Sequence, residues 1–172
     1  MPILRMRDAS YVSRGVTVVS QATLDVNPGE RLMRRAASPL EAQAIAMMAA
    51  ALVRPTSGTV EIGDYDPRVQ PVHCKRLVGF VQHDPLPLHE MGFDRYIQYR
   101  AALWDIDRER ARAVACVLLE RLSGMHEAFA YPLVGALVAN PAMLVLDRPQ
   151  PNDRAAIYAT AGPCAIFETE LA

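Results

Sequence analysis

Few features that mark a specialised protein class are present in this sequence of 172 residues. The cysteines are Cys74, Cys116 and Cys164, and they share no metal-ligand spacing, which favours free thiols in a reducing compartment. The longest apolar run, residues 44–53, is too short to cross a bilayer, and the polar start does not resemble a signal peptide. We therefore expect a soluble, cytoplasmic protein with no segment inserted in a membrane.

A basic excess is also missing. The 18 basic and 19 acidic residues leave a net charge of -1, which argues against a dedicated nucleic-acid binder. No metal site is expected because the histidines show no ligand spacing: His73, His83, His89 and His126. Apolar residues, in contrast, make up 51% of the chain, enough for the core of one domain over residues 1–172.

Alternation of apolar and polar residues predicts half-buried strands over residues 3–12 and 15–26. Continuous apolar runs at 75–82 and 142–147 are typical of buried strands in a parallel sheet. Further short strands are predicted at 59–65 and 164–169, whereas 31–35 carries three arginines and makes a poor interior strand. Together these segments predict an α/β fold with a largely parallel sheet.

Helices are predicted between these strands. Residues 38–53 are rich in Ala, Met and Leu, residues 86–130 form a largely helical insertion, and 131–140 suggest another helix. The clearest helix covers residues 107–122, with Asp107 as its N-cap. One face of that helix is expected to be apolar, formed by Ala111, Val114, Leu118 and Leu122.

Short segments spread over nearly the whole chain carry a family resemblance. They are Pro-Gly-Glu at 28–30, "LVRPTSGTVEIGDYD" at 52–66, "RLVGFVQHDPLP" at 76–87, "RLSGMHEA" at 121–128 and "ALVANPAMLVLDRP" at 136–149. In this order and spacing the chain resembles the nucleotide-binding domain of ABC transporters, a P-loop NTPase-like ATP-binding cassette. The resemblance implies a small N-terminal β subdomain, a helical insertion and a cytoplasmic role beside a membrane permease.

The resemblance also shows which residues of an ATP site are absent. The family's phosphate-loop glycines fall on Ala36, Pro39 and Glu41, its lysine on Ala42, and its magnesium-binding Ser or Thr on Gln43. Glycines let backbone N–H groups close around phosphates, and the lysine neutralises the β- and γ-phosphates. We therefore expect no cofactor, because neither ATP nor Mg²⁺ should bind in the family manner.

The segment "SPLE" offers a physical replacement for the lost phosphate loop. Ser38 suits the N-cap of the following helix, Pro39 its first position and Glu41 its third, which is a capping box. These side chains can satisfy the N–H groups that otherwise face phosphate, and the Glu41 carboxylate would repel an anion. Ordinary helix capping with no history of ATP binding gives the same pattern, and either origin disfavours phosphate.

Two more positions depart from the family at the far side of the site. Asp147 matches the aspartate that supports magnesium, but Arg148 stands where the resemblance places the catalytic glutamate, and Glu170 where it places the switch histidine. A guanidinium cannot act as a general base. We hypothesise that Arg148 pairs with Glu170 or Glu41; the alternative is two unrelated, solvated charges.

Other family positions are kept in part. Ser123 and Gly124 match the signature motif, which lacks its second glycine and is followed by Pro132, expected to interrupt the helix; a plain helix-end turn is the alternative. Gln82 falls on the Q-loop glutamine. The resemblance implies that the Q-loop and insertion receive a permease helix, and it places Tyr11 near adenine. The candidate interface residues are Gln82, Phe93, Tyr96 and Trp104.

These features predict a degenerate cassette, a pseudo-ATPase that acts as a structural or regulatory subunit beside a membrane permease or a competent ABC ATPase. Three alternatives stay open. The chain could be the half-site partner of an active cassette, lending Ser123 and Gly124 to a shared ATP site. It could be a soluble protein-binding module unrelated to transport, or a decayed copy without function.

Overall fold

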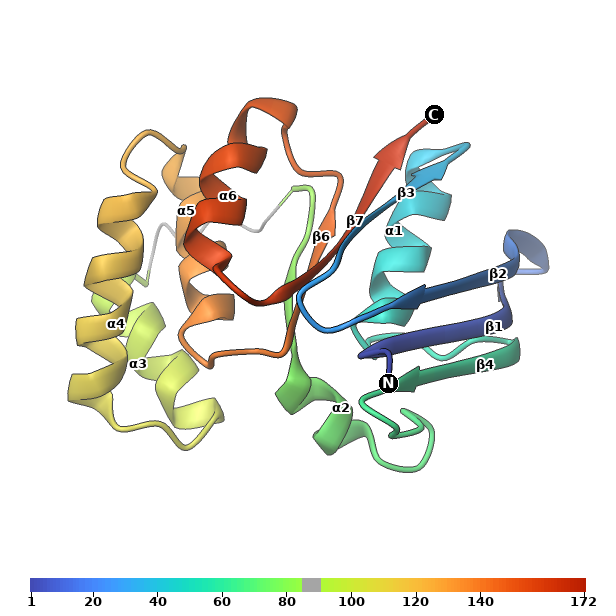
Figure 1. The fold of residues 1–172 in the computed structure, drawn as a ribbon, viewed down its shortest axis with the longest axis horizontal. Coiled ribbons are helices and arrows are strands. Elements are labelled where there is room, and N and C mark those ends of the chain that lie inside the picture. Colours follow the sequence, from blue (N-terminus) through green and yellow to red (C-terminus); the bar gives the residue numbers. More distant parts are fainter. Residues whose placement is uncertain (85–90) are drawn as a thin grey trace.

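The computed structural model describes residues 1–84 and 91–172, and it places two sheets side by side with helices around the second (Figure 1). The strands β1 (Leu4–Ser13), β2 (Val16–Val26) and β4 (Ser57–Ile62) form an antiparallel sheet in the order β2-β1-β4. A parallel sheet has the order β3-β7-β6-β5 and is built from β3 (Arg31–Ala36), β5 (Val78–Val81), β6 (Met143–Asp147) and β7 (Ala165–Leu171). The predicted α/β fold with a small N-terminal β section is confirmed.

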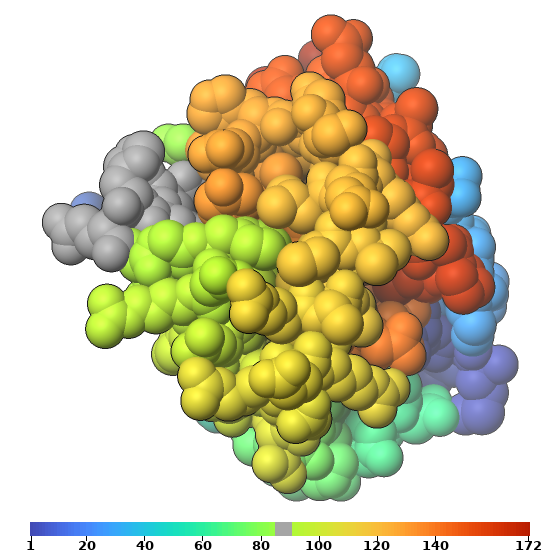
Figure 2. Space-filling view, turned by 90° about the vertical axis from the view of Figure 1, so that its left-hand side faces the viewer, coloured from blue at the N-terminus to red at the C-terminus, as the bar shows by residue number. Residues whose placement is uncertain are grey.

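Helices cover both faces of the parallel sheet. Helix α1 (Pro39–Ala49) packs on one face, whereas α5 (Glu127–Leu137) and α6 (Arg154–Ala161) pack on the other. Helices α3 (Phe93–Leu103) and α4 (Arg108–Arg121) lie outside α5 and form the side of the molecule seen in Figure 2. The remaining helical segments are α2 (Pro71–Leu77) and the 3-10 turn η1 (Pro151–Asp153).

Two apolar clusters form the core, one on each face of the parallel sheet. Strand β6 is buried along its whole length, and its side chains alternate between the clusters. Val145 packs toward α1, and Leu144 packs toward α5 and α6. On β7, Phe167 and Ile166 divide in the same way. This two-sided burial explains why β6 reads as a continuous apolar run instead of an alternating one.

Strand β3 has a neighbour on one side only among the described residues, namely β7. Its arginines Arg31, Arg34 and Arg35 are all exposed, which is the usual way to keep an edge strand from pairing with another chain. The expectation that "RLMRR" makes a poor interior strand therefore agrees with its edge position.

The strand predicted at 75–82 is wrong over its first three residues. Pro71 occupies the start of a short helix, α2, which continues through Leu77, so that β5 begins only at Val78. The predicted insertion at 86–130 contains α3, α4 and the start of α5, with a turn at Asp105. Residues 85–90 of that range lie outside the described residues.

Helix α4 confirms its predicted cap and corrects its predicted face. The Asp107 carboxylate accepts a hydrogen bond from the Arg110 backbone N–H at 2.9 Å. Ala111 and Leu122 are buried as expected, but Val114 is 37% exposed and Ala115 is fully buried in its place. The buried stripe is made of alanines four residues apart, which let the neighbouring helices approach closely.

Helix α5 continues through Pro132, so the expected interruption there is wrong. Packing outweighs the missing N–H, because the second half of α5 is buried between the sheet and α3. Gly135 is required by this packing: a Cβ at that position would lie 2.5 Å from the Tyr96 ring. Among the described residues, no helix combines the length and apolar character needed to span a membrane.

Candidate functional site

The carboxyl ends of the four parallel strands meet along one edge of the sheet, which we call the carboxyl edge. It is formed by Ala36 at the end of β3, Val81 at the end of β5, Asp147 at the end of β6 and Leu171 at the end of β7. Open α/β sheets bind their ligands at this edge. The structure thus brings most of the predicted site positions together: the phosphate-loop positions, Gln82, Asp147, Arg148 and Glu170.

The N-terminus of α1 is capped by the chain itself. Ser38 Oγ accepts a hydrogen bond from the Glu41 backbone N–H at 3.1 Å, and Pro39 takes the first helical position. The Glu41 carboxylate accepts from the Ala37 backbone N–H at 2.8 Å, one residue before the partner of an ideal capping box. The serine half of the predicted box is confirmed, and the glutamate closes the loop ahead of the helix.

Two further phosphate-loop positions contribute no charge to this edge. Ala42, at the lysine position, is completely buried in the core that α1 shares with the sheet. Gln43, at the magnesium-ligand position, is half-buried and carries a neutral amide. Neither side chain can neutralise a phosphate, so the local chemistry matches that of an ordinary capped helix.

Asp147 and Arg148 form an ion pair at the end of β6. Arg148 Nε lies 2.8 Å from Asp147 Oδ1, and Arg148 Nη2 lies 3.1 Å from Asp147 Oδ2, so the guanidinium spans both carboxylate oxygens. The side chains are 1% exposed for Asp147 and 17% exposed for Arg148. The hydrogen bond to Asp147 raises the pKa of Arg148, which keeps the guanidinium charged.

Two residues from neighbouring strands complete the surroundings of Asp147. The Thr169 hydroxyl donates to Asp147 Oδ1 at 3.2 Å, and the His83 backbone N–H approaches Oδ2 at 3.5 Å. The His83 ring Nδ1 lies 2.8 Å from the Arg148 carbonyl oxygen, which implies that this nitrogen carries the proton. The carboxylate that would support Mg²⁺ in an ATP-binding cassette is thus surrounded by protein donors.

The hypothesis that Arg148 pairs with Glu170 or Glu41 is wrong. Glu170 accepts from Arg154 Nη2 at 3.2 Å and lies 3.9 Å from Arg35 Nε. Alternation along β7 explains this: Thr169 faces the same side of the sheet as Asp147, so Glu170 faces the opposite side, toward α6.

Sequence reasoning passed over His83 and Thr169. The sequence pattern marks His83 only as a histidine without metal-ligand spacing, and it does not single out Thr169. The register that pairs Asp147 with Thr169 across β6 and β7 would have identified the threonine, but it requires the strand order. No local signal in the sequence marks the His83 contact with Arg148.

Ser123 and Gly124 lie in the turn between α4 and α5, where both are exposed. The helix that follows is capped by its own side chain, because His126 Nδ1 accepts from the Ala128 backbone N–H at 3.2 Å. Glu127 adds a negative charge to its first turn. This helix start therefore resembles the start of α1: each has one backbone N–H bonded to the side chain of its N-cap residue and an acidic residue in its first turn.

The predicted interface and adenine residues have mainly packing contacts. Phe93 and Tyr131 lie with ring centroids 4.8 Å apart, Tyr96 packs against Gly135, and the Trp104 ring lies 6.0 Å from the Arg100 guanidinium carbon. Tyr11 is half-buried against the first core cluster.

The remaining site position, Gln82, bonds locally. Its side-chain amide donates to the Asp84 carbonyl at 2.7 Å. Within residues 1–84 and 91–172, no group of three or more His, Cys, Asp or Glu side chains is arranged to hold a metal ion.

Neither the family models nor the curated proteins searched contain a match to this chain. Several solved structures, in contrast, superpose on this chain. The ATP-binding subunit of an ABC transporter superposes with a TM-score of 0.81 at 16% identity, covering 98% of this chain and 79% of that one. CbiO1 from Clostridium perfringens, part of the ABC transporter complex cbiONQ, superposes with a TM-score of 0.74 at 14% identity, covering 99% and 78%.

A third structure, the ATP-binding cassette MJ0796 in a post-hydrolysis dimer bound to ADP and Pi, has a TM-score of 0.75 at 14% identity and covers 97% of this chain and 87% of that one. At these sequence identities the comparisons show that the fold is shared, and nothing finer. The order of motifs in the sequence, the parallel sheet and these superpositions agree. The chain thus has the P-loop NTPase-like fold of the ATP-binding cassettes of ABC transporters over almost its whole length.

Proposed function

We propose that this chain is a pseudo-ATPase: a cassette-fold subunit that neither binds Mg-ATP in the usual manner nor hydrolyses it. The observation that carries this proposal is the Asp147–Arg148 pair. A magnesium ion at Asp147 would have to displace a charged guanidinium that spans both carboxylate oxygens. The position of the expected general base is held by the same Arg148, and a guanidinium cannot accept a proton from water.

The capped start of α1 supports the same conclusion independently. A phosphate at this helix would meet the Glu41 carboxylate, and Ser38 already occupies one of the N–H groups that would receive it. The segment also lacks the lysine and glycines of a phosphate loop. The start of α1 therefore disfavours an anion and the end of β6 disfavours a metal ion, and these are different elements of the same edge.

Our proposed role is structural or regulatory, in contact with a membrane permease subunit or a competent ATP-binding subunit on the cytoplasmic side of a membrane. Support comes from the fold, which CbiO1 shares as part of a transporter complex. The chain would then reach the membrane through its partner and not through a segment of its own.

The test is calorimetric titration of the purified chain with Mg-ATP. The natural chain should give no saturable heat up to millimolar nucleotide. The matched variant is Glu41→Gly, Ala42→Lys and Arg148→Glu together, with circular dichroism to confirm folding, since Ala42 is buried. Saturable binding in the micromolar range by the natural chain would refute the proposal, whatever the variant does.

Association with a membrane complex is tested separately. The tagged chain should be expressed in the organism that naturally produces it, so that its partner is present. It should then sediment with membranes and be released by mild detergent together with an integral membrane protein. Pure lipid vesicles should not retain it. Recovery entirely in the supernatant would instead favour the soluble-module alternative.

A half-site role is favoured only by the exposure of Ser123 and Gly124, which a second cassette could reach. The capped start of α5 argues against it, because a partner's γ-phosphate would meet His126 and Glu127. Replacing Ser123 by Ala should leave the ATPase rate of any co-purified cassette unchanged. A loss of about tenfold or more would support the shared site.

A further inference from the structure

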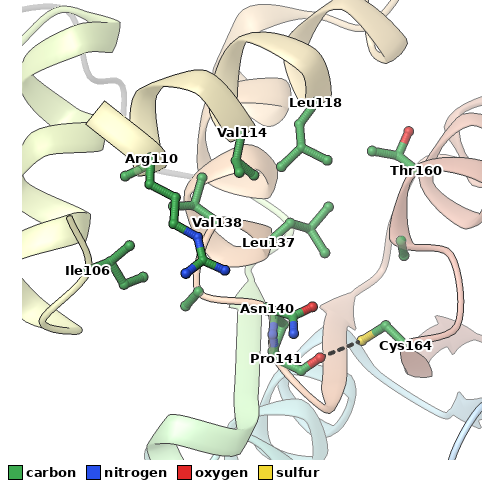
Figure 3. A pocket seen from close by; sticks show the side chains of 13 residues that line it. Ile106, Arg110, Val114, Leu118, Leu137, Val138, Asn140, Pro141, Thr160 and Cys164 are labelled. Atoms are coloured by element: carbon green, nitrogen blue, oxygen red, sulfur yellow. Dashed lines mark hydrogen bonds between the residues drawn. The ribbon is translucent and has the colours of Figure 1, made fainter. Parts of the chain in front are cut away.

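A pocket of about 480 Å³ opens on the side of the parallel sheet opposite the carboxyl edge (Figure 3). Asn140 and Pro141 precede β6, and Cys164 precedes β7, so the pocket lies at the amino ends of these strands. Its other walls come from α4 and from the ends of α5 and α6. The volume is within the range of pockets that hold small organic ligands.

Most of the residues that line this pocket are aliphatic. Val114 and Leu118 from α4 face Leu137 and Val138 at the end of α5, and Ile106 adds a side wall (Figure 3). Val114 remains 37% exposed although it belongs to an otherwise apolar surface. A hydrocarbon body placed here would bury this surface, which stabilises a complex by the hydrophobic effect.

The polar groups of the pocket include donors that have no acceptor. Arg110 is exposed to solvent, and among the described residues its guanidinium makes no ion pair or hydrogen bond; only its backbone N–H is engaged, by Asp107. Thr160 is 6% exposed, and its hydroxyl is buried without a partner. In Figure 3 the guanidinium of Arg110 extends from α4 past Val138 toward the turn that carries Asn140.

The charge of the lining selects the ligand. None of the residues that line the pocket is acidic, whereas Arg110 supplies a permanent positive charge. An arginine beside an aliphatic wall matches a carboxylate joined to a hydrocarbon chain, because the fork of the guanidinium donates hydrogen bonds to both carboxylate oxygens. A cationic ligand would meet Arg110 and find no carboxylate among the residues that line the pocket.

We propose that this pocket binds a small aliphatic monocarboxylate, with its carboxylate on Arg110 and its chain along Val114, Leu118 and Leu137. The Asn140 amide is placed to hydrogen-bond the same head group. This ligand site does not depend on whether the chain binds ATP, because it lies at the opposite edge of the sheet and uses none of the residues at the carboxyl edge.

The experiment is calorimetric titration with sodium octanoate, below its micelle concentration, and with octan-1-ol as the uncharged counterpart. The natural chain should bind octanoate at least tenfold more tightly than octanol. Arg110→Gln should weaken octanoate binding roughly tenfold or more and leave octanol unchanged, since a charge-assisted bidentate contact is lost. The matched control is Arg112→Gln, on the same helix and paired with Asp94 at 3.5 Å, which should bind as the natural chain does.

Two cysteines report the location of binding. Cys164 lines the pocket and Cys116 is exposed elsewhere on the surface, so octanoate should slow alkylation of Cys164 and leave that of Cys116 unchanged. Because burial raises the pKa of Cys164 to about 11, the labelling is run at alkaline pH. Equal affinity for octanoate and octanol, or an equal loss with Arg112→Gln, would overturn the proposal and leave an apolar surface suited to a protein helix.

Discussion

The two edges of the parallel sheet differ in whether their polar side chains have hydrogen-bond partners within the protein. At the carboxyl edge, Asp147 is surrounded by Arg148, Thr169 and His83, and the start of α1 is closed by its own side chains. At the amino edge, Arg110 and the buried hydroxyl of Thr160 have no acceptor among the described residues.

This contrast shows where an α/β cassette can still take a ligand. A polar group that is satisfied within the protein stabilises the fold, and a ligand must compete with it. A buried polar group without a partner carries a desolvation cost that a ligand can remove. On this ground, the carboxyl edge is the less receptive of the two.

The largest expected change in stability comes from removing the Asp147 carboxylate at the carboxyl edge. Asp147→Ala should lower the free energy of unfolding by about 3 kcal/mol, because it leaves the Arg148 guanidinium in a mostly buried position without its partner. The measurement is urea denaturation. Asp94→Ala serves as the control, since its pair with Arg112 is more than half exposed and should contribute less than about 1 kcal/mol. Equal losses would mean that the Asp147 pair contributes no more than a surface pair.

A matched pair of threonines compares the edges directly. Thr169→Val should cost about 1 to 2 kcal/mol, because Asp147 loses the hydrogen bond from this hydroxyl and the Arg148 backbone N–H loses an acceptor. Thr160→Val should be neutral or stabilise the fold by up to about 1 kcal/mol, because it replaces a buried hydroxyl that has no partner. Thermal and urea unfolding of both variants would check this. The contrast between the edges fails if the two changes have the same sign and size.

The cap of α1 is expected to contribute less. Ser38→Ala should cost about 1 kcal/mol, since the Glu41 backbone N–H loses its acceptor. Ser123→Ala, in the exposed turn after α4, is the control and should change stability by less than about 0.5 kcal/mol. Denaturant midpoints are the readout, and a neutral Ser38→Ala would show that water replaces the cap without loss.

The smallest effect concerns Glu168, the exception near the carboxyl edge. Its side chain is 3% exposed, lies 3.0 Å from Arg154 Nε and has the Tyr158 hydroxyl as a further neighbour. Burial raises the pKa of Glu168 above its ordinary 4.5. The folded state therefore binds this proton more tightly, and the contribution of Glu168 to stability falls as the pH rises from about 4.5 through the folded-state pKa.

Glu168→Gln removes that titration. The stability of the variant relative to the natural chain should rise with pH through the same window. Urea midpoints measured from pH 4 to pH 8 would show this. A difference that falls with rising pH would mean that the pairing of Glu168 with Arg154 outweighs its burial.

Much of the fold could be predicted because its signals are local. The apolar run at 142–147, the alternation before residue 26 and the Asp107 cap each depend on neighbours in sequence, and the structure confirms them. The face of α4 could not be predicted in full. Whether Val114 or Ala115 is buried depends on which helices pack against α4, and that is a long-range property.

The same distinction between local and long-range contacts applies to the candidate site. The Ser38 cap joins groups three residues apart and could be predicted from "SPLE". The partner of Arg148 could not be predicted, because opposite charge alone does not say which face of β7 carries Glu170. His83 and Thr169 reach Asp147 only because β5 and β7 flank β6.

The sequence by itself determined the fold class, since periodicity, capping residues and motif order act over a few residues and survive any arrangement of the rest. It also determined that residues 36–43 contain no lysine and no glycine. Only the tertiary structure decided which groups surround Asp147 at the carboxyl edge and where a pocket lies, because ion pairs and cavities are formed by groups that packing brings together from distant segments.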